Sequence, residues 1–232
     1  MPIQRRPASG EILNTLALKT PFQVLDTSAL QQLCARARLQ DFATGEQLYS
    51  EGQTDVLPAF LLSGMVKLTQ NAVSGRECLA HMVRAGHFLD VGVMFYTSGL
   101  PFSACGVKAG QLVWFDRRDL AAIVQQDGKF AYQLLSALAL RQKSMAHKMT
   151  STQGRISAQK RVVSWLLHRA KLEKTHRLDL MFTREVMAGI IGIRRESLSR
   201  VLSSLATAGL IENGRKHIAL RDVDALQQLV VA

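Results

Sequence analysis

The distribution of apolar and polar positions divides the chain into a strand-rich first half and a helix-rich second half. Between about Leu39 and Phe115 the apolar residues come in short runs separated by glycines. Runs this short and this regularly spaced predict a small antiparallel barrel or roll rather than a parallel sheet. Ser74-Gly75 lies between two alternating runs and predicts a hairpin turn. The predicted strands are Gln47–Tyr49, Ala59–Leu62, Met65–Gln70, Glu77–Val83 and Gln111–Phe115.

A long helical pattern follows the strands. From Lys129 to about Gln153 there is no proline and no interior glycine, and a shorter helix is predicted over Arg117–Gln126. A near-heptad seam of this kind either packs on the chain's own roll or pairs with a second copy, and its length and spacing favour a homodimer. The seam consists of Phe130, Leu134, Ala137, Leu138, Arg141, Met145, Lys148 and Met149.

Shorter elements surround these two regions. Residues 1–20 predict a short lead-in segment, and Ser28 is a candidate N-cap for a helix over Ala29–Ala37. Gly154 predicts a hinge, which a helix over Ser157–Leu172 follows.

The stretch Thr183–Leu205 predicts two short helices joined by a tight turn, with Thr183 as the first N-cap and Gly192 at the turn. The second helix is amphipathic, because its polar and apolar residues fall on opposite arcs. Guanidinium, carboxylate and hydroxyl groups on one arc can read base edges in the DNA major groove. The polar arc holds Arg195, Glu196, Ser199 and Arg200, and the apolar arc holds Leu198, Val201, Leu202 and Leu205.

A hairpin is predicted directly after this helix. Asn213-Gly214 lies between the runs Leu210–Glu212 and Lys216–Leu220, and this dipeptide is typical of a two-residue hairpin turn. A hairpin in this place is a wing, with Arg215, Lys216 and His217 placed to meet phosphate. Such contacts add affinity and salt sensitivity but read no sequence.

The charge agrees with a nucleic-acid partner. The chain of 232 residues carries a formal net charge of +11. From Ser151 onward there are 14 Lys+Arg against 7 Asp+Glu, while residues 1–150 hold 15 against 11. The end that contains the helical pair is thus the more basic one, which favours double-stranded DNA over an idle basic surface.

Several other classes of protein find no support in the sequence. The three cysteines are isolated, so neither a zinc ribbon nor a clustered iron–sulfur site is predicted. No apolar run is long enough to span a membrane, and the N-terminus has no apolar signal core, so we expect a soluble cytoplasmic protein. The common nucleotide-binding and hydrolase motifs are absent, and we expect no enzyme.

Four segments together resemble one family. They are Glu51–Leu68, Ser74–Glu77, Arg84–Phe95 and Arg194–Ile211. In this order, from about Pro21 to Ala225, they are similar to the cyclic-AMP-receptor/fumarate–nitrate-reduction (CRP/FNR) family of bacterial transcription regulators. The resemblance implies an α+β fold with an N-terminal cyclic-nucleotide-binding-like β-roll, a long dimerisation helix and a C-terminal winged helix-turn-helix. The corresponding domains are residues 1–127, 128–153 and 154–232.

The resemblance also assigns roles on the second helix of the pair. Glu196-x-x-Ser199-Arg200 matches the E-x-x-S-R signature of the family, and Arg195 matches the additional arginine of the cyclic-AMP branch. It implies that Arg195 and Arg200 read guanines, that Glu196 reads C or A of the complementary strand, and that Ser199 supports a thymine or phosphate contact. TGTGA-like half-sites in an inverted repeat are expected, with TTGAT-like half-sites as the alternative. The homodimer would recruit or block RNA polymerase. The expected DNA-binding set is Arg195, Glu196, Ser199, Arg200, Thr183, Arg194 (a phosphate contact), Ser197 and Lys216.

The effector is defined less sharply. Family members that bind cyclic AMP carry a G-E-L segment and a later R-S pair, where this chain has Asp90-Val91-Gly92 and Phe102-Ser103. An anionic phosphate beside Asp90 and Phe102 would be costly to desolvate, which disfavours cyclic AMP. A different small-molecule or gas effector is therefore expected.

Haem is one candidate, since the FLDVGVMF segment is similar to nitric-oxide-responsive regulators, some of which bind haem, and His and Met are axial ligands of haem iron. Met145 and Met149 at i, i+4 are more often residues of a dimer seam, and His81 and His87 are more often exposed strand-end histidines. The alternative function is a haem or small-molecule binding protein whose basic end reads no specific sequence. The candidate ligands are His81, His87, Met82, Met94, Met145, His147 and Met149, and no other metal site is indicated.

Overall fold

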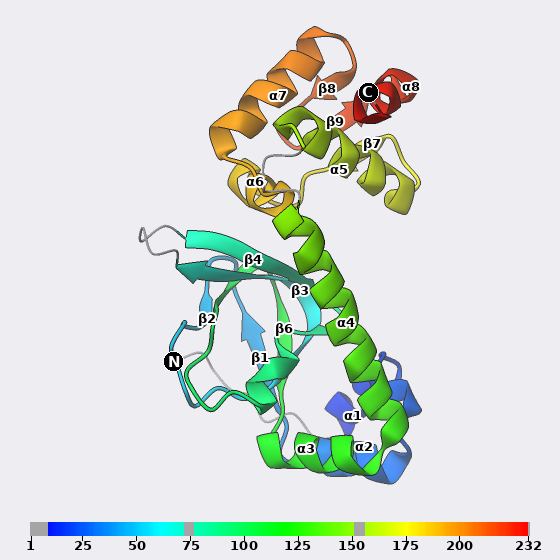
Figure 1. Cartoon of the computed structure of the whole chain (residues 1–232). Coiled ribbons are helices and arrows are strands. Elements are labelled where there is room, and N and C mark those ends of the chain that lie inside the picture. Colours follow the sequence, from blue (N-terminus) through cyan, green and yellow to red (C-terminus); the bar gives the residue numbers. More distant parts are fainter. Residues whose placement is uncertain (1–8, 72–76, 151–155, 232) are drawn as a thin grey trace. The chain divides into compact units, whose positions relative to one another are not determined.

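The computed structural model describes residues 9–71, 77–150 and 156–231, and Figure 1 draws the whole chain. The chain divides into two compact units, Met1–Lys143 and Ser144–Ala232. The first unit holds an antiparallel roll with helices, and the second holds four helices and a small sheet. The predicted fold class is confirmed. Among the described residues, no helix is both long and apolar enough to cross a membrane.

The roll is a six-stranded antiparallel sheet in which the central strands β3 and β6 pair along most of their length. The order β1-β6-β3-β4 is extended by β2, which pairs with β6, and by β5, which pairs with β3. Figure 1 shows α4 running along this roll. The strands are β1 (Arg38–Phe42), β2 (Gln47–Tyr49), β3 (Ala59–Asn71), β4 (Glu77–Arg84), β5 (His87–Phe88) and β6 (Ser103–Trp114).

The two runs predicted over 59–62 and 65–70 are one strand. Gly64 has a φ of +87°, and a Cβ on it would lie 2.6 Å from the carbonyl oxygen of Lys108 on β6. A glycine therefore lets β3 continue through an irregular register where another residue would clash. The sequence pattern missed β1, which is mostly polar, and the first half of β6, which consists mostly of small residues that show no clear alternation. Ser74-Gly75 lies outside the described residues, although Asn71 and Glu77 on either side are paired.

The helices of the first unit pack with the roll around a cluster of phenylalanines, which includes Phe22, Phe60, Phe115 and Phe130. Ser28 is not the N-cap that the sequence predicted. Asp26 has the extended backbone of a cap, and its carboxylate accepts a hydrogen bond from the Ala29 amide at 2.7 Å. Residues 1–20 include a helix rather than only a lead-in. The helices are α1 (Ser9–Ala17), η1 (Phe22–Val24), α2 (Thr27–Cys34), η2 (Val91–Met94), α3 (Arg117–Gln126) and α4 (Gly128–Thr150).

The predicted dimer seam of α4 packs mainly on the protein's own roll. Phe130 and Leu134 are buried in the phenylalanine core, and Leu138 packs against it. A different face of the helix is open, where Tyr132 is 70% and Leu135 63% exposed. Because α4 has apolar residues on both faces, periodicity alone did not distinguish them. The side chains of Lys148 and Met149 lie outside the description.

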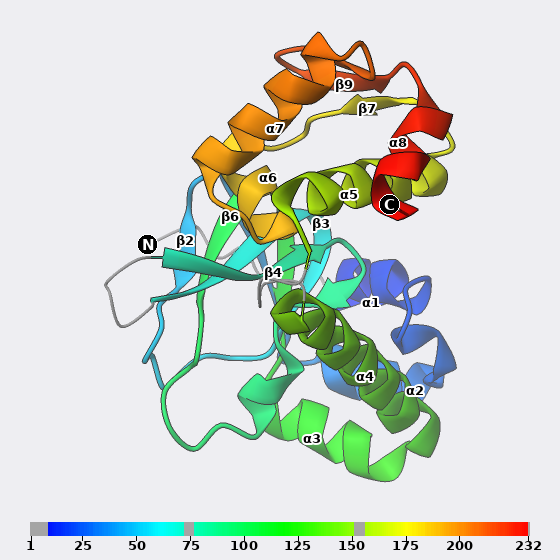
Figure 2. The same cartoon turned by 45° about the horizontal axis from the view of Figure 1, so that its top comes forward.

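The second unit is built on a three-stranded antiparallel sheet in the order β7-β9-β8. Its core joins the apolar faces of all four helices to this sheet. Helix α5 contacts both α7 and α8, as Figure 2 shows. The elements are α5 (Ala158–Glu173), β7 (Arg177–Asp179), α6 (Arg184–Ile191), α7 (Arg195–Thr207), β8 (Ile211–Asn213), β9 (His217–Leu220) and α8 (Val223–Val231).

Candidate DNA-reading site

The helix pair α6–α7 has the predicted local structure. The Thr183 hydroxyl accepts a hydrogen bond from the Val186 amide at 3.3 Å and caps α6. At the other end, Gly192 has a φ of +75° and closes the helix with its amide bonded to Ala188 and Gly189. Glycine adopts this left-handed conformation without a Cβ penalty, so the chain can turn sharply into α7. The predicted cap and turn are confirmed.

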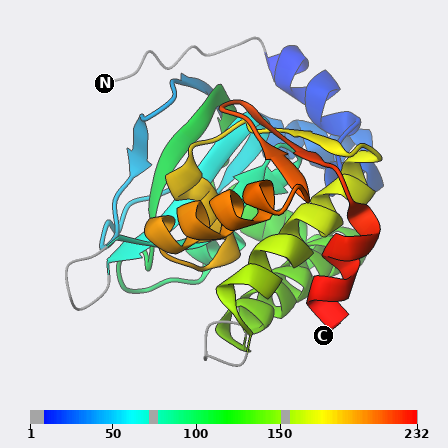
Figure 3. The same cartoon turned by 90° about the horizontal axis from the view of Figure 1, so that it is seen from above.

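Helix α7 divides into a packed face and an open face. Leu198, Leu202 and Leu205 are buried in the core of the second unit. The opposite arc of α7 is exposed. On its packed side α7 contacts α5, and Figure 3 shows the two helices next to each other. Within the described part of the chain, no hydrogen bond or ion pair is found for the side chains on the open arc, so they are available to a ligand. These exposed residues are Arg195, Glu196, Ser199 and Arg200; Arg194 is also exposed, and Ser197 is half-buried.

A half-buried arginine holds the turn between the two helices. Arg161 on α5 donates from Nη2 to the carbonyl oxygens of Ile191 at 3.0 Å and Gly192 at 2.5 Å. These are C-terminal carbonyls of α6, which a cation stabilises. Burial lowers the pKa of Arg161 from its ordinary value. The role of Arg161 was not predicted from the sequence.

A second arginine on α5 organises the approach to α6. Arg169 is buried, lies 5.1 Å from the Trp165 ring and 5.7 Å from the Phe182 ring, and forms an ion pair with Glu173 at 2.5 Å. It also donates to the Asp179 carbonyl of β7. The sequence did hold a signal for both arginines: Arg161, Trp165 and Arg169 follow one another at i, i+4, i+8. This spacing places both arginines beside a tryptophan on one helix face.

The wing is present, but its turn differs from the prediction. Asn213 pairs with Ile218 in the β8–β9 ladder, so the connection is longer than two residues. Neither Asn213 nor Gly214 has the positive φ that a two-residue type I′ turn requires. A Cβ on Gly214 would come within 2.9 Å of the His217 ring. Close packing, rather than a positive φ, therefore explains the glycine at this position. The hairpin prediction is confirmed and the turn assignment is wrong.

Only two of the three predicted wing cations are free of acidic partners in the described chain. Arg215 and Lys216 are exposed. His217 instead lies 3.2 Å from Glu212, which also pairs with Arg221. Hydrogen bonds from His217 and then Arg221 lower the pKa of Glu212. The geometry therefore leaves Arg215 and Lys216 as the wing cations available to phosphate and gives His217 a role within the hairpin.

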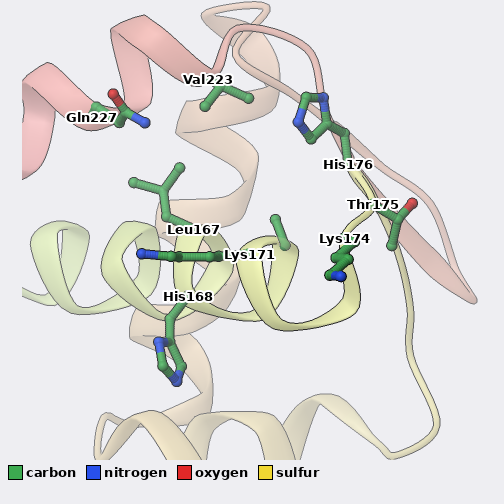
Figure 4. A pocket seen from close by; sticks show the side chains of 9 residues that line it. Leu167, His168, Lys171, Lys174, Thr175, His176, Val223 and Gln227 are labelled. Carbon is green, nitrogen blue, oxygen red and sulfur yellow. The ribbon is translucent and has the colours of Figure 1, made fainter.

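A separate groove lies between α5 and α8 (Figure 4). Its volume is about 680 Å³, and it contains none of the predicted DNA-binding residues. His168 and Lys171 come from α5, and Gln227 comes from α8. Lys174, at the end of α5, has a left-handed φ of +50°. The groove is basic in character.

The first unit contains a buried polar cluster where the roll meets α4. Asp90 is 4% exposed, and its carboxylate accepts hydrogen bonds from Tyr96 at 3.0 Å and Arg141 at 3.2 Å. Arg141 also donates to the Leu89 carbonyl at 3.1 Å and lies 5.7 Å from the Phe102 ring. These contacts fix α4 on the segment that carries η2.

Burial and the nearby Asp90 charge perturb both tyrosines of this cluster. Burial and then Asp90 raise the pKa of Tyr96 to about 12. The same causes, in the same order, raise the pKa of Tyr49. The Tyr49 hydroxyl is buried and has no hydrogen-bond partner among the described residues. An unsatisfied buried hydroxyl is costly, so this atom is a candidate ligand contact.

The candidate haem ligands do not form one site in the described residues. His81 and Met82 are neighbours on β4, opposite Leu68 and Lys67, so they point to opposite faces of the sheet. His87 is exposed on β5, whereas Met94 packs in the phenylalanine core. Met145 belongs to the second unit, and nothing is described of the His147 and Met149 side chains. No group of three or more His, Cys, Asp or Glu that could hold a metal occurs among the described residues. The described residues therefore do not bring the candidate ligands together, and haem binding stays a prediction.

Known proteins share both the fold and the reading domain. Residues 160–229 match the sequence model of the Crp-like helix-turn-helix domain. The chain is 26% identical over 219 residues to the CRP-like cAMP-activated global transcriptional regulator of Mycobacterium tuberculosis, covering 88% of this chain and 93% of that protein. It is 25% identical over 233 residues to the nitrogen fixation regulation protein FixK of Bradyrhizobium diazoefficiens, covering 97% and 96%.

A solved structure has a similar fold. The structure of FixK2 from Bradyrhizobium japonicum has a TM-score of 0.70 at 22% identity and covers 84% of this chain and 98% of that one. The fold and the open arc of α7 thus define a transcription regulator with a DNA-binding helix-turn-helix. Over most of its length the chain is similar to transcription regulators of the CRP/FNR family.

Proposed function

We propose that α7 reads an inverted-repeat DNA site of the TGTGA type. The observation that carries this proposal is the exposed arc of α7, which lies opposite a buried leucine face. Arg195 and Arg200 would each take guanine O6 and N7 with a guanidinium fork, and Glu196 would accept from the complementary base. Thr183, Arg194, Ser197 and Ser199 would contact the backbone or support the base contacts.

The wing adds affinity that does not depend on sequence. Arg215 and Lys216 are exposed beside the Gly214 turn and would neutralise phosphates of the DNA backbone. The α7 arc would thus supply specificity and the wing would supply salt-dependent affinity.

The regulator acts as a homodimer through the open face of α4. Tyr132, Leu135, Ala139 and Gln142 are all exposed and follow one another at the i, i+3, i+7, i+10 spacing of a coiled-coil seam. Large apolar side chains left open on one helix face are typical of an interface. Two copies would place their reading helices about 34 Å apart, one turn of DNA, which accounts for an inverted repeat.

An effector controls the DNA-binding form through the junction of the roll with α4. Supporting this are the buried contacts of Arg141 with Asp90 and the unsatisfied hydroxyl of Tyr49. A ligand that binds one arrangement of these groups better than another would shift the population of the DNA-binding form. Arg141 is already hydrogen-bonded to the buried Asp90 carboxylate, so a cyclic-nucleotide phosphate at this place would be repelled by that carboxylate. The effector is therefore a different small molecule or gas.

The remaining parts of the proposal concern the whole protein. The functional domains are residues 1–127, 128–153 and 154–232. The DNA-bound regulator would act on RNA polymerase, which it recruits or blocks. Gly154, the predicted hinge, lies outside the described residues.

Binding to a palindromic TGTGA duplex and to a scrambled duplex, each at two salt concentrations, tests this function. We expect the palindrome to bind about 10³-fold or more tightly than the scrambled duplex, and both affinities to fall with salt. Equal affinities for the two duplexes would contradict specific reading and support instead a small-molecule binding protein with an incidental basic surface. A TTGAT palindrome distinguishes the two half-site types.

A further inference from the structure

Arg184 connects the first helix of the reading domain to the wing. It is the first residue of α6, and its Nη2 donates to the Asn213 side-chain oxygen at 2.6 Å and to the Gly214 carbonyl at 2.9 Å. Asn213 ends β8 and Gly214 begins the wing turn, so one guanidinium holds both residues at the base of the tip. These are the described hydrogen bonds that join the α6 side chains to the wing.

The chemistry of this contact differs from that of an ordinary surface ion pair. Arg184 is half-buried and forms no ion pair in the described chain, since both acceptors on the wing are neutral. Burial lowers its pKa from the ordinary value. A planar guanidinium that spans two acceptors fixes their relative position, which a flexible ammonium does less well.

The two sides of the wing are held differently: β9 pairs with β7, and the Lys216 carbonyl accepts a hydrogen bond from the Leu180 amide at 2.7 Å, whereas β8 is an edge strand. Arg215 and Lys216, next to the two acceptors, are exposed. The His217–Glu212 and Arg221–Glu212 contacts join residues of the hairpin and its flank to one another, not to α6. Because β8 is the edge strand of the sheet β7-β9-β8, its end at Asn213 pairs with β9 on one side only. Among the described contacts, the hydrogen bonds from Arg184 tie this β8 side of the tip to the DNA-reading pair.

We propose that Arg184 is a positioning residue that places the wing cations Arg215 and Lys216 on the DNA backbone while α7 occupies the groove. Its role is exerted through the wing and not by contact with a base. This inference rests on the proposed phosphate contact of the wing.

A double-mutant cycle on DNA binding tests the inference. The variants of the full-length protein are Arg184→Gln, the wing variant Arg215→Ala/Lys216→Ala, and their combination. The wing variant loses two phosphate contacts, so its salt slope should fall by about 1.8 and its affinity by about thirtyfold at 0.15 M salt, for palindromic and scrambled duplexes alike. Arg184→Gln should reproduce most of this loss. In the Arg184→Gln background, the wing substitutions should cost less than about threefold, because the cations are already misplaced.

Asn213→Ala and Lys171→Ala serve as matched variants. Asn213→Ala removes one acceptor and leaves every cation in place, and it should weaken both duplexes in the same direction as Arg184→Gln. Lys171→Ala removes a cation from the groove between α5 and α8, and its effect should be additive with that of the wing variant. Thermal unfolding of each variant establishes that the second unit is folded.

The outcomes separate the inference from the proposal beneath it. If the wing variant binds DNA like the unmodified protein, the wing contact is wrong, and the role of Arg184 falls with it. In a second outcome the wing variant binds DNA more weakly, but its loss of affinity is fully additive with that of Arg184→Gln, and Asn213→Ala has no effect. Arg184 then acts as an independent contact, and only its positioning role is overturned.

Discussion

The polar side chains on the open arc of α7 face outward and have no partner within the described chain. The leucines on the opposite face of the same helix are buried. Arg200 is exposed, whereas its neighbour Leu202 is buried. The half-buried guanidinium of Arg161 donates to backbone carbonyls and stabilises the fold. An exposed one with no such partner can form its bidentate hydrogen bonds with a base, so Arg161 and Arg200 have different roles although both are arginines on helices.

Replacing Arg200 with alanine should relax specificity at one base position. We expect a loss of about 1–3 kcal/mol on the matched palindrome, with little change on scrambled DNA, because one bidentate contact is removed. The measurement is competition binding against duplexes substituted at each half-site position. Arg215→Ala is the control, since a phosphate contact should weaken all duplexes alike. Unchanged affinities of Arg200→Ala for both specific and random DNA would remove Arg200 from the reading set.

Residue-level prediction was accurate where a single local interaction decides the structure. Thr183 caps α6 and Gly192 ends it because each needs only its nearest backbone neighbours. Ser28 failed as a cap because Asp26, two residues earlier, offers the same chemistry. Arg161 and Arg184 were missed because their acceptors are 29 to 31 residues away in the sequence.

At the scale of elements, the junction between η2 and α4 is held by buried polar groups rather than by apolar packing alone. Tyr96 and Arg141 meet at the Asp90 carboxylate. A hydrogen-bonded group of this kind is stable only in one charge state, because the low-dielectric surroundings penalise an additional negative charge. The junction should therefore respond to alkaline pH.

The stability of the first unit should fall between pH 10 and about pH 12. Burial and Asp90 raise the pKa of Tyr96 from 10.0 to about 12. The unfolded chain then loses this proton at a lower pH than the folded chain, so the contribution is complete below about pH 10 and is lost as pH rises through the folded pKa. Thermal unfolding as a function of pH, with tyrosinate absorbance as the second readout, measures it. Tyr96→Phe should flatten this pH dependence, and Tyr132→Phe, at an exposed position, should leave it unchanged. An identical alkaline slope in Tyr96→Phe and the unmodified protein would contradict the assignment.

For the whole molecule, the proposed inverted repeat requires two reading helices and hence two chains. The open face of α4 is the surface that would join them, with Leu135 63% exposed at its centre. Burying this side chain against a second copy would remove a large apolar surface from water.

Replacing Leu135 with glutamate should convert the proposed dimer to a monomer. Two carboxylates facing each other across the seam would be desolvated without partners, at a cost of several kcal/mol. Sedimentation equilibrium measures the change in mass, and binding to the full inverted repeat should fall at least tenfold, while binding to an isolated half-site persists. Leu172→Glu is the matched control, because Leu172 is 62% exposed on α5. A Leu135→Glu protein that stays dimeric would exclude this face as the interface.

The sequence by itself determined the order of roll, long helix and helix-turn-helix, the amphipathic division of α7 and the presence of a wing. Each of these follows from periodicity or from contacts between near neighbours, which the chain encodes locally. Only the tertiary structure decided which face of α4 is open, how the wing turn is formed, and which arginines are buried. Those features depend on partners far apart in the sequence, such as Arg184 with Gly214 and Arg141 with Asp90, whose proximity exists only after folding.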